Sequence, residues 1–162
     1  MSAVRKAYNS KKSKVVSTAF GAVFKFLDNT ISERKKLIDW INRTAWITRD
    51  QYEPHKYLDE VAKNKFFICP LGNGIQSPKI FECYLVRTIP IVQRKIAFEE
   101  LKKYGFPILI VDSWDQLSLN YLEIIYKKEF SNINWQRIQY AMTNKGVNEF
   151  FLQETGFPNI LK

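Results

Sequence analysis

Histidine and cysteine are scarce in this chain, which has one histidine and two cysteines among its 162 residues. Two cysteines are too few for a disulfide framework, and together with one histidine they are too few for a Cys/His zinc cluster. A mechanism that requires two histidines is excluded as well. Cys69 and Cys83 fall in apolar segments, and we expect both to be buried, reduced thiols.

Long apolar runs are also absent. No run approaches the ~18 residues that a membrane-spanning helix needs. Met1 is followed by a polar, basic stretch instead of the apolar core of a secretory signal. We therefore expect a soluble chain that is cytoplasmic or peripheral on the cytosolic face of a membrane, and that is not secreted.

What remains has the composition of a globular domain. Hydrophobic residues make up 46% of the chain and aromatic residues 15%, which disfavours disorder. A chain of this length buries roughly two thirds of its unfolded surface. We find no internal repeat or low-complexity tract, and we predict one α/β domain over residues 15–162.

The formal net charge of +9 is concentrated near the N-terminus. Residues 1–65 contain 14 Lys or Arg against 7 Asp or Glu, and the rest of the chain contains 11 against 9. A basic run without acids occupies residues 5–14, and we expect residues 1–14 to form a flexible arm. Weak contact with an anionic surface is the alternative, but no nucleic-acid motif accompanies the charge, so specific nucleic-acid binding is not expected.

Strand-like and helix-like segments alternate along the chain. Short apolar runs predict buried strands, and apolar residues at helical intervals predict the helices between them. Strands with both faces covered, separated by helices, are typical of a Rossmann-like doubly wound domain with a mainly parallel five-stranded sheet. The predicted strands are 15–20, 45–48, 66–69, 89–92 and 107–111; the predicted helices are 31–43, one opening at Pro54, 77–87, 98–104, 118–130 and 134–154.

Ligands of such sheets bind beyond the carboxyl ends of the strands, so the loops after the strands are the places to look. One of these loops carries Gly72-Asn73-Gly74 and leads into a helix with Ser77 as a good N-cap. The helix start offers unpaired N–H groups to an anion, and Lys79 adds a positive charge. Glu82, one turn further on, is suited to accept hydrogen bonds from hydroxyl groups. A nucleoside diphosphate fits this pattern, but so does a plain turn with a plain cap and an exposed Lys–Glu pair.

The order of these residues favours the nucleotide site over the plain turn. The run Phe67-Ile-Cys-Pro-x-Gly-Asn-Gly-Ile-x-Ser-x-Lys-Ile-x-Glu82, with Arg87-Thr-Ile-Pro-Ile-Val92 and Ile108-Leu-Ile-Val-Asp-x-Trp114 after it, resembles exostosin-like glycosyltransferases. The resemblance is to their C-terminal, nucleotide-sugar-binding domain, one half of the two-domain GT-B architecture. It is close over residues 66–114 and looser over 14–43.

The resemblance implies a nucleotide-diphosphate sugar as substrate, with no cofactor and no metal. It implies that Glu82 holds the ribose hydroxyls and that Lys79 faces the diphosphate, although the family commonly has arginine there, whose bidentate contact lysine cannot make. Transfer to a hydroxyl acceptor would need a partner chain that supplies the acceptor domain. The catalytic residues are unknown, and a non-catalytic nucleotide-binding module is the alternative. The residues implied to line the phosphate loop are Gly72, Asn73, Gly74 and Ser77; Arg34 and Gly21 are implied on the phosphate or sugar side.

Three other polar or aromatic residues receive structural interpretations. We expect His55 to lie on the surface, because no partner acid or nucleophile is marked by the sequence. We expect Trp114 to pack in the core, with stacking on a base as the alternative. Asp112, at the end of the last predicted strand, is expected to cap the next turn, with a ligand contact as the alternative.

Overall fold

A computed structural model describes residues 10–20, 28–47, 49–71 and 78–155. The chain divides into two compact units, residues 1–132 and 133–162. The first contains the sheet and its covering helices. The second contains α7 (Trp135–Ala141) and α8 (Asn144–Thr155). The expectation of one domain over residues 15–162 stays a prediction.

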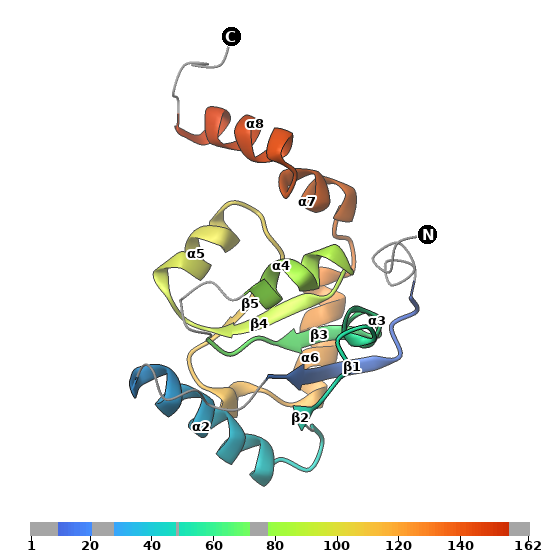
Figure 1. Ribbon diagram of the computed structural model, residues 1–162, viewed down its shortest axis with the longest axis vertical. Helices are drawn as coiled ribbons and strands as arrows, with labels where there is room; N and C mark the ends of the chain where they lie inside the picture. Colours follow the sequence, from blue (N-terminus) through green and yellow to red (C-terminus); the bar gives the residue numbers. More distant parts are fainter. Residues whose placement is uncertain (1–9, 21–27, 48, 72–77, 156–162) are drawn as a thin grey trace. The chain divides into compact units, whose positions relative to one another are not determined.

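The sheet confirms the predicted α/β class. In the described part of the chain, five strands form one sheet in the order β2-β1-β3-β4-β5, and each neighbouring pair is parallel (Figure 1). The strands are β1 (Lys14–Ala19), β2 (Arg49–Asp50), β3 (Asn64–Ile68), β4 (Ile89–Gln93) and β5 (Leu109–Val111).

The central strand β3 shows why the sheet needs helices on both faces. Phe66 and Phe67 are adjacent and both fully buried, and adjacent side chains of a strand point to opposite faces. The ring of Phe66 packs edge-on against Phe130, with centroids 5.7 Å apart, and the ring of Phe67 packs edge-on against Tyr57 at 6.3 Å. The apolar pairs of this strand therefore hold one layer of helices on each side of the sheet.

Helices follow each strand, as the alternation in the sequence predicts. Because the crossover from β1 to β2 runs in the opposite direction to the later ones, right-handed crossovers place α2 on the face opposite α3, α4 and α5. No helix in the described part of the chain is long and apolar enough to cross a membrane. The helices of the first unit are α2 (Asp28–Arg43), α3 (Tyr57–Ala62), α4 (Pro78–Leu85), α5 (Ile96–Lys103), the 3-10 turn η1 (Trp114–Gln116), α6 (Leu119–Ile125) and the π-helical turn η2 (Tyr126–Phe130).

The strand predicted at 45–48 is wrong. Thr44–Ile47 form the turn that ends α2, and the second strand is the two-residue β2 that follows. Thr44 closes the helix, because its hydroxyl donates to the Trp40 carbonyl at 2.6 Å. The ring of Trp46 packs edge-on against Trp40 with centroids 5.5 Å apart. The apolar run therefore covers the end of a helix instead of entering the sheet.

The two closing helices, predicted at 118–130 and 134–154, are each interrupted. The first ends at Ile125 and continues as the turn η2. The second breaks into α7 and α8 at Thr143, whose hydroxyl donates to the Tyr140 carbonyl at 2.8 Å and accepts from the Gly146 N–H at 3.0 Å. One threonine side chain thus ends one helix and caps the next, a competition that periodicity alone does not reveal.

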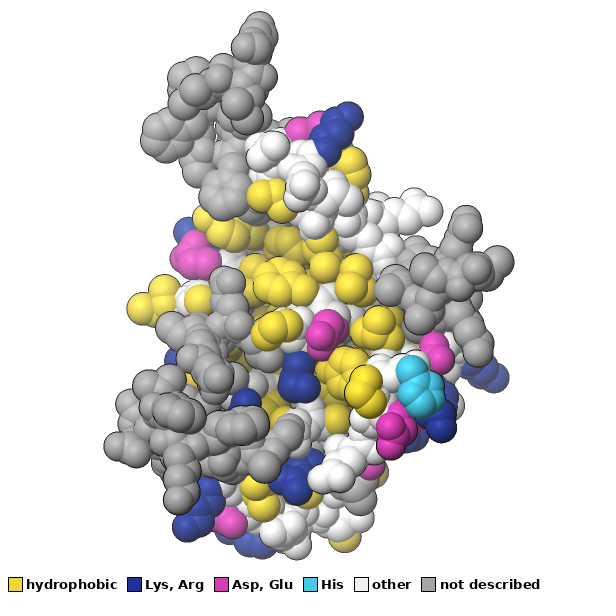
Figure 2. Space-filling view, viewed as in Figure 1, with side chains coloured by type: hydrophobic (Ala, Val, Ile, Leu, Met, Phe, Trp, Pro, Cys, Tyr) yellow, Lys and Arg dark blue, Asp and Glu magenta, His cyan; other side chains and the backbone are white. Residues whose placement is uncertain are grey.

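The surface and core positions of the singled-out residues agree with their interpretations. The single histidine, His55, is exposed, and Figure 2 shows it on the surface among charged side chains. Cys69 and Cys83 are free, buried thiols with their sulfur atoms 3.8 Å apart. Trp114 is 4% exposed and belongs to the core.

Lys12 joins the N-terminal segment to the sheet. Its Nζ donates to the Ala62 carbonyl at 2.9 Å, the Val86 carbonyl at 3.2 Å and the Thr88 hydroxyl at 2.9 Å. Lys12 belongs to the described part of the arm predicted over residues 1–14. It therefore packs this part of the arm against the amino-terminal ends of the strands. Burial lowers the pKa of Lys12 from 10.5 to about 8, an effect that the nearby Cys83 opposes.

We predict that Lys12 gives folding a distinct pH dependence. The unfolded chain keeps the Lys12 proton up to about pH 10.5, whereas the folded chain loses it near pH 8, so the free energy of unfolding gains a contribution that rises with pH between these values. The difference in unfolding free energy between the wild type and Lys12→Met should rise by about 1–3 kcal/mol over this range. Urea unfolding at pH 7 to 10.5 measures it.

Taking the difference between the two proteins cancels the titration of groups that do not interact with Lys12. Lys11→Met is the matched control, because Lys11 is an exposed neighbour of the same type. A wild-type to Lys12→Met difference that stays flat across this pH range would contradict the assignment.

Candidate functional site

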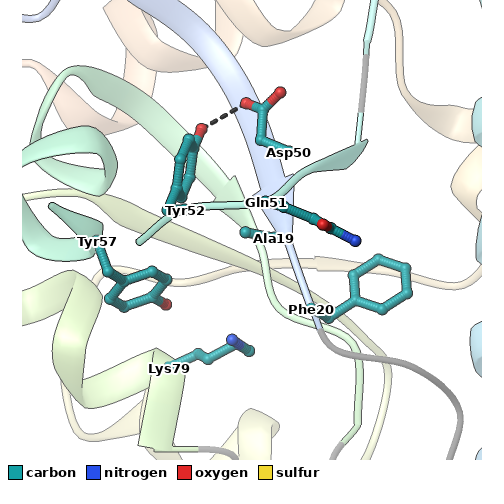
Figure 3. A pocket seen from close by; sticks show the side chains of 7 residues that line it. All are labelled: Ala19, Phe20, Asp50, Gln51, Tyr52, Tyr57 and Lys79. Atoms are coloured by element: carbon teal, nitrogen blue, oxygen red, sulfur yellow. Dashed lines mark hydrogen bonds between the residues drawn. The ribbon is translucent and has the colours of Figure 1, made fainter. Parts of the chain in front are cut away.

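The direction of the crossovers reverses at β1, which has β2 on one side and β3 on the other. Ligands of open parallel sheets bind beyond the carboxyl ends of the strands at such a reversal. A pocket with a volume of about 310 Å³ lies beyond the carboxyl ends of β1 and β2, and we call it the switch-point pocket (Figure 3). Its lining comes from the ends of β1 and β2 and from the starts of α3 and α4: Ala19, Phe20, Asp50, Gln51, Tyr52, Tyr57 and Lys79.

Lys79 is a predicted site residue that the structure places in this pocket. It is the second residue of α4, and its Nζ lies 5.1 Å from the centroid of the Tyr57 ring. A cation over an aromatic face is stabilised by about 0.5–2 kcal/mol, which favours this position of the ammonium group. Figure 3 shows the side chain reaching from α4 towards the space between Tyr57 and Phe20. The pocket therefore has one aromatic wall and a cation beside it.

Glu82 lies one turn further along α4 and is half-buried. It does not line the switch-point pocket, but it borders the same tyrosine as Lys79. The pKa of Tyr57 is raised far above its ordinary value, first by burial and then by nearby acidic groups that include Cys83 and Glu82. Lys79 and Glu82, both predicted site residues, therefore lie near the same tyrosine.

Arg34 acts on the backbone in this structure. Its Nε donates a hydrogen bond of 2.9 Å to the carbonyl of Leu71, the residue that precedes the loop 72–77. The contact spans α2 and the segment after β3, which are far apart in sequence. Arg34 is therefore placed to hold the entrance of the predicted phosphate loop.

Five predicted site residues lie outside the described residues. They are Gly21, Gly72, Asn73, Gly74 and Ser77. Their implied roles in binding phosphate or sugar stay predictions.

Sequence patterns did not single out Asp50, the last residue of β2, or Tyr52, two residues later, and both line the pocket. The Tyr52 hydroxyl donates to Asp50 Oδ2 and lies 3.4 Å from the Ser17 hydroxyl of β1. Burial, followed by the hydrogen bond to Asp50, raises the pKa of Tyr52 to about 12. Figure 3 shows the hydroxyl and the carboxylate meeting on the side of the pocket away from Lys79. The loop position predicted a ligand site here, but no residue spacing marks a tyrosine–aspartate contact.

The ends of β4 and β5 carry a separate group of charges. Arg94 bonds to Asp112 and to Glu99, and Lys95 Nζ lies 3.0 Å from Glu33 Oε1 of α2. The pKa of Asp112 is lowered, chiefly by its hydrogen bond from Arg94. Asp112 is therefore an ion-pair partner, and the prediction that it caps the next turn is wrong.

The side chain that caps this turn is Ser113. Its hydroxyl accepts from the Asp115 N–H at 3.3 Å, and it begins η1. Ser113 directly follows Asp112 in the sequence. The longer Asp112 side chain reaches the guanidinium of Arg94 instead.

Comparison with known proteins leaves the family open. No model of a known protein family matches the chain, and no curated protein matches it significantly. Among the described residues, no three His, Cys, Asp or Glu side chains gather closely enough to hold a metal ion. The candidate site consequently rests on the switch-point pocket and on the residues around it.

We predict that Arg34→Met lowers the free energy of unfolding by about 1 kcal/mol, the usual contribution of one hydrogen bond, because the Leu71 carbonyl loses its donor. Methionine keeps most of the apolar stem. Lys35→Met, at an exposed position next to it on α2, is the control and should leave the stability within about 0.5 kcal/mol. Chemical denaturation of the three proteins measures this. Equal stabilities of Arg34→Met and Lys35→Met would show that the hydrogen bond from Arg34 to Leu71 does not stabilise the fold.

Proposed function

We propose that the chain is a glycosyltransferase-type domain that binds a nucleotide-diphosphate sugar as donor. The observation that carries the proposal is the position of Lys79. It lines a pocket at the carboxyl ends of parallel strands, at the point where the direction of the crossovers reverses. That is where α/β sheets bind nucleotides. A cation on the wall of such a pocket favours an anionic group such as a diphosphate.

The other features of the pocket suit the rest of a nucleotide. Tyr57, which is half-buried, supplies aromatic surface for a planar base, and the Gln51 amide can donate and accept hydrogen bonds beside the buried Phe20. Figure 3 shows these three side chains around the same space as Lys79. The volume of about 310 Å³ accommodates part of a nucleotide, with the remainder extending beyond the edge of the sheet.

The remaining roles follow from the resemblance to exostosin-like glycosyltransferases. Glu82 would hold the ribose hydroxyls, the loop 72–77 would line the diphosphate, and Arg34 would support that loop through Leu71. A partner chain would supply the acceptor domain. Contact of residues 1–14 with an anionic surface stays a proposal, to which Lys12 contributes little because three acceptors already hold its ammonium group.

A non-catalytic nucleotide-binding module is the second candidate. Lys79, Tyr57 and Glu82 would serve it equally well, because the roles proposed for them are in binding and not in transfer. Incubating the chain with nucleotide sugars and simple hydroxyl acceptors separates the two functions. Release or transfer of the sugar supports the transferase, whereas binding without turnover supports the module.

We predict that UDP, GDP or ADP binds the wild-type chain with a Kd of about 1 mM or tighter, which needs roughly 4 kcal/mol. Lys79→Ala should weaken binding about 10- to 100-fold, because it removes a charge-assisted contact to phosphate. Glu82→Gln should weaken the binding of ribonucleotides by about tenfold and the binding of their 2′,3′-dideoxy analogues by much less. Isothermal titration calorimetry measures these affinities.

Lys103→Ala is the matched control, because Lys103 is an exposed lysine of α5 and its loss changes the net charge by the same amount. It should bind nucleotides as the wild type does. If none of the three nucleotides binds the wild type, both the transferase and the module are wrong. If Lys79→Ala and Lys103→Ala weaken binding equally, the switch-point pocket is not the site.

A further inference from the structure

The switch-point pocket has opposite charges on its two sides. Lys79 of α4 lines one side, and Asp50, the last residue of β2, lines the other (Figure 3). The lysine attracts phosphate groups, whereas the carboxylate of Asp50 repels them. A nucleotide in this pocket therefore has a preferred direction, with its diphosphate towards Lys79 and another part of the molecule towards Asp50.

The position of Asp50 is set by the sheet and by two hydroxyl groups. Its backbone pairs with Ala19 of β1. The Tyr52 hydroxyl donates to Asp50 Oδ2 and lies 3.4 Å from the hydroxyl of Ser17, also on β1. A carboxylate has about four acceptor positions, so the bond from Tyr52 does not saturate it. Asp50 is thus placed to accept hydrogen bonds from a ligand in the pocket.

An aromatic wall connects the two charged groups. Tyr52, which bonds to Asp50, has its ring 6.4 Å from the ring of Tyr57, and Lys79 Nζ lies 5.1 Å from the Tyr57 ring. Both tyrosines line the pocket and are half-buried. A planar base can lie against such a wall. Its hydrogen-bonding edge then faces the carboxylate, because the phosphates occupy the other side.

Among the nucleobases, guanine suits a carboxylate best. It presents two neighbouring N–H donors, the ring N1–H and the exocyclic amino group, so it can form two charge-assisted hydrogen bonds to one carboxylate. Uracil presents one N–H between two carbonyl oxygens, which a carboxylate repels. Adenine and cytosine present an amino group beside a ring nitrogen that only accepts, and that nitrogen is repelled as well.

We infer that Asp50 makes the switch-point pocket selective for guanine, so that the donor is a guanosine-diphosphate sugar. The inference rests on the proposed donor site and adds its base. Gln51 lines the same pocket, and its amide can donate to the O6 atom of guanine. Lys79 has the same phosphate contact with every nucleotide, so the selectivity depends on the Asp50 side of the pocket.

Isothermal titration calorimetry with GDP, UDP, ADP, CDP and inosine diphosphate tests the assignment. GDP should bind the wild-type chain about tenfold more tightly than UDP, ADP or CDP. Inosine diphosphate differs from GDP only in lacking the exocyclic amino group, and it should bind roughly three- to tenfold more weakly than GDP. Both comparisons use the wild-type chain alone and do not require a variant to fold.

Asp50→Asn replaces one acceptor oxygen by an amino group, and it should weaken the binding of GDP about 10- to 100-fold. Xanthosine diphosphate has a carbonyl oxygen where GDP has its amino group, so the asparagine N–H can donate to it. Asp50→Asn should therefore bind xanthosine diphosphate about tenfold more tightly than GDP. Asp39→Asn is the matched control, because it makes the same change at an exposed position of α2 outside the pocket, and it should keep the wild-type preference.

Three results would overturn the guanine assignment: GDP binding no tighter than UDP and ADP, inosine diphosphate binding as tightly as GDP, or an Asp50→Asn variant that keeps the wild-type preference. Nucleotides still bind in each of these results, so the donor site would stand and only its base would be wrong. Binding of none of the nucleotides would instead remove the donor site and the base assignment together.

Discussion

The parallel pairing of β1 with β3 is the constraint on which the rest of this structure depends. Val16 pairs with Phe66 and Thr18 with Ile68, while β2 attaches to the other side of β1. Parallel neighbours must be joined by crossovers, so the carboxyl ends of all five described strands lie on the same side of the sheet, which we call its carboxyl edge. Phe20, Tyr52 and Lys79 come from three different parts of the sequence and meet at that edge.

The two edges of the sheet are held by different interactions. Where the strands begin, one partly buried lysine, Lys12, satisfies three acceptors on two segments, at Ala62 and at 86–88. Where they end, the contacts are dispersed: Arg34 holds Leu71, Lys95 pairs with Glu33, and Arg94 bonds to Asp112. The contacts at the amino-terminal ends of the strands are therefore structural. The contacts at the carboxyl-terminal ends leave pockets between them, as ligand binding requires.

Sequence patterns predicted most of the fold but only part of the site. Apolar runs such as Phe66–Ile68 must be buried whatever surrounds them, so the strands and the sheet type follow from them. The run 45–48 misled because Trp46 covers Trp40 of α2, a tertiary contact that has no local signal. Lys79 was predicted because it follows a glycine loop at a helix start. Tyr57 and Tyr52 were not, because their place in the pocket depends on how α3 and β2 meet β3 and β1, and neither residue belongs to a motif.

The most direct test of the donor-site account is to map where a nucleotide binds. Amide chemical shifts of the ¹⁵N-labelled chain, recorded during titration with UDP, report on the backbone N–H groups of all residues except proline at once. The account predicts that the largest changes fall at Phe20, Leu71 and Lys79, around the ends of β1 and β3 and the start of α4. Changes centred on the opposite edge, near Lys12 and Thr88, or no changes at saturating UDP, would contradict it.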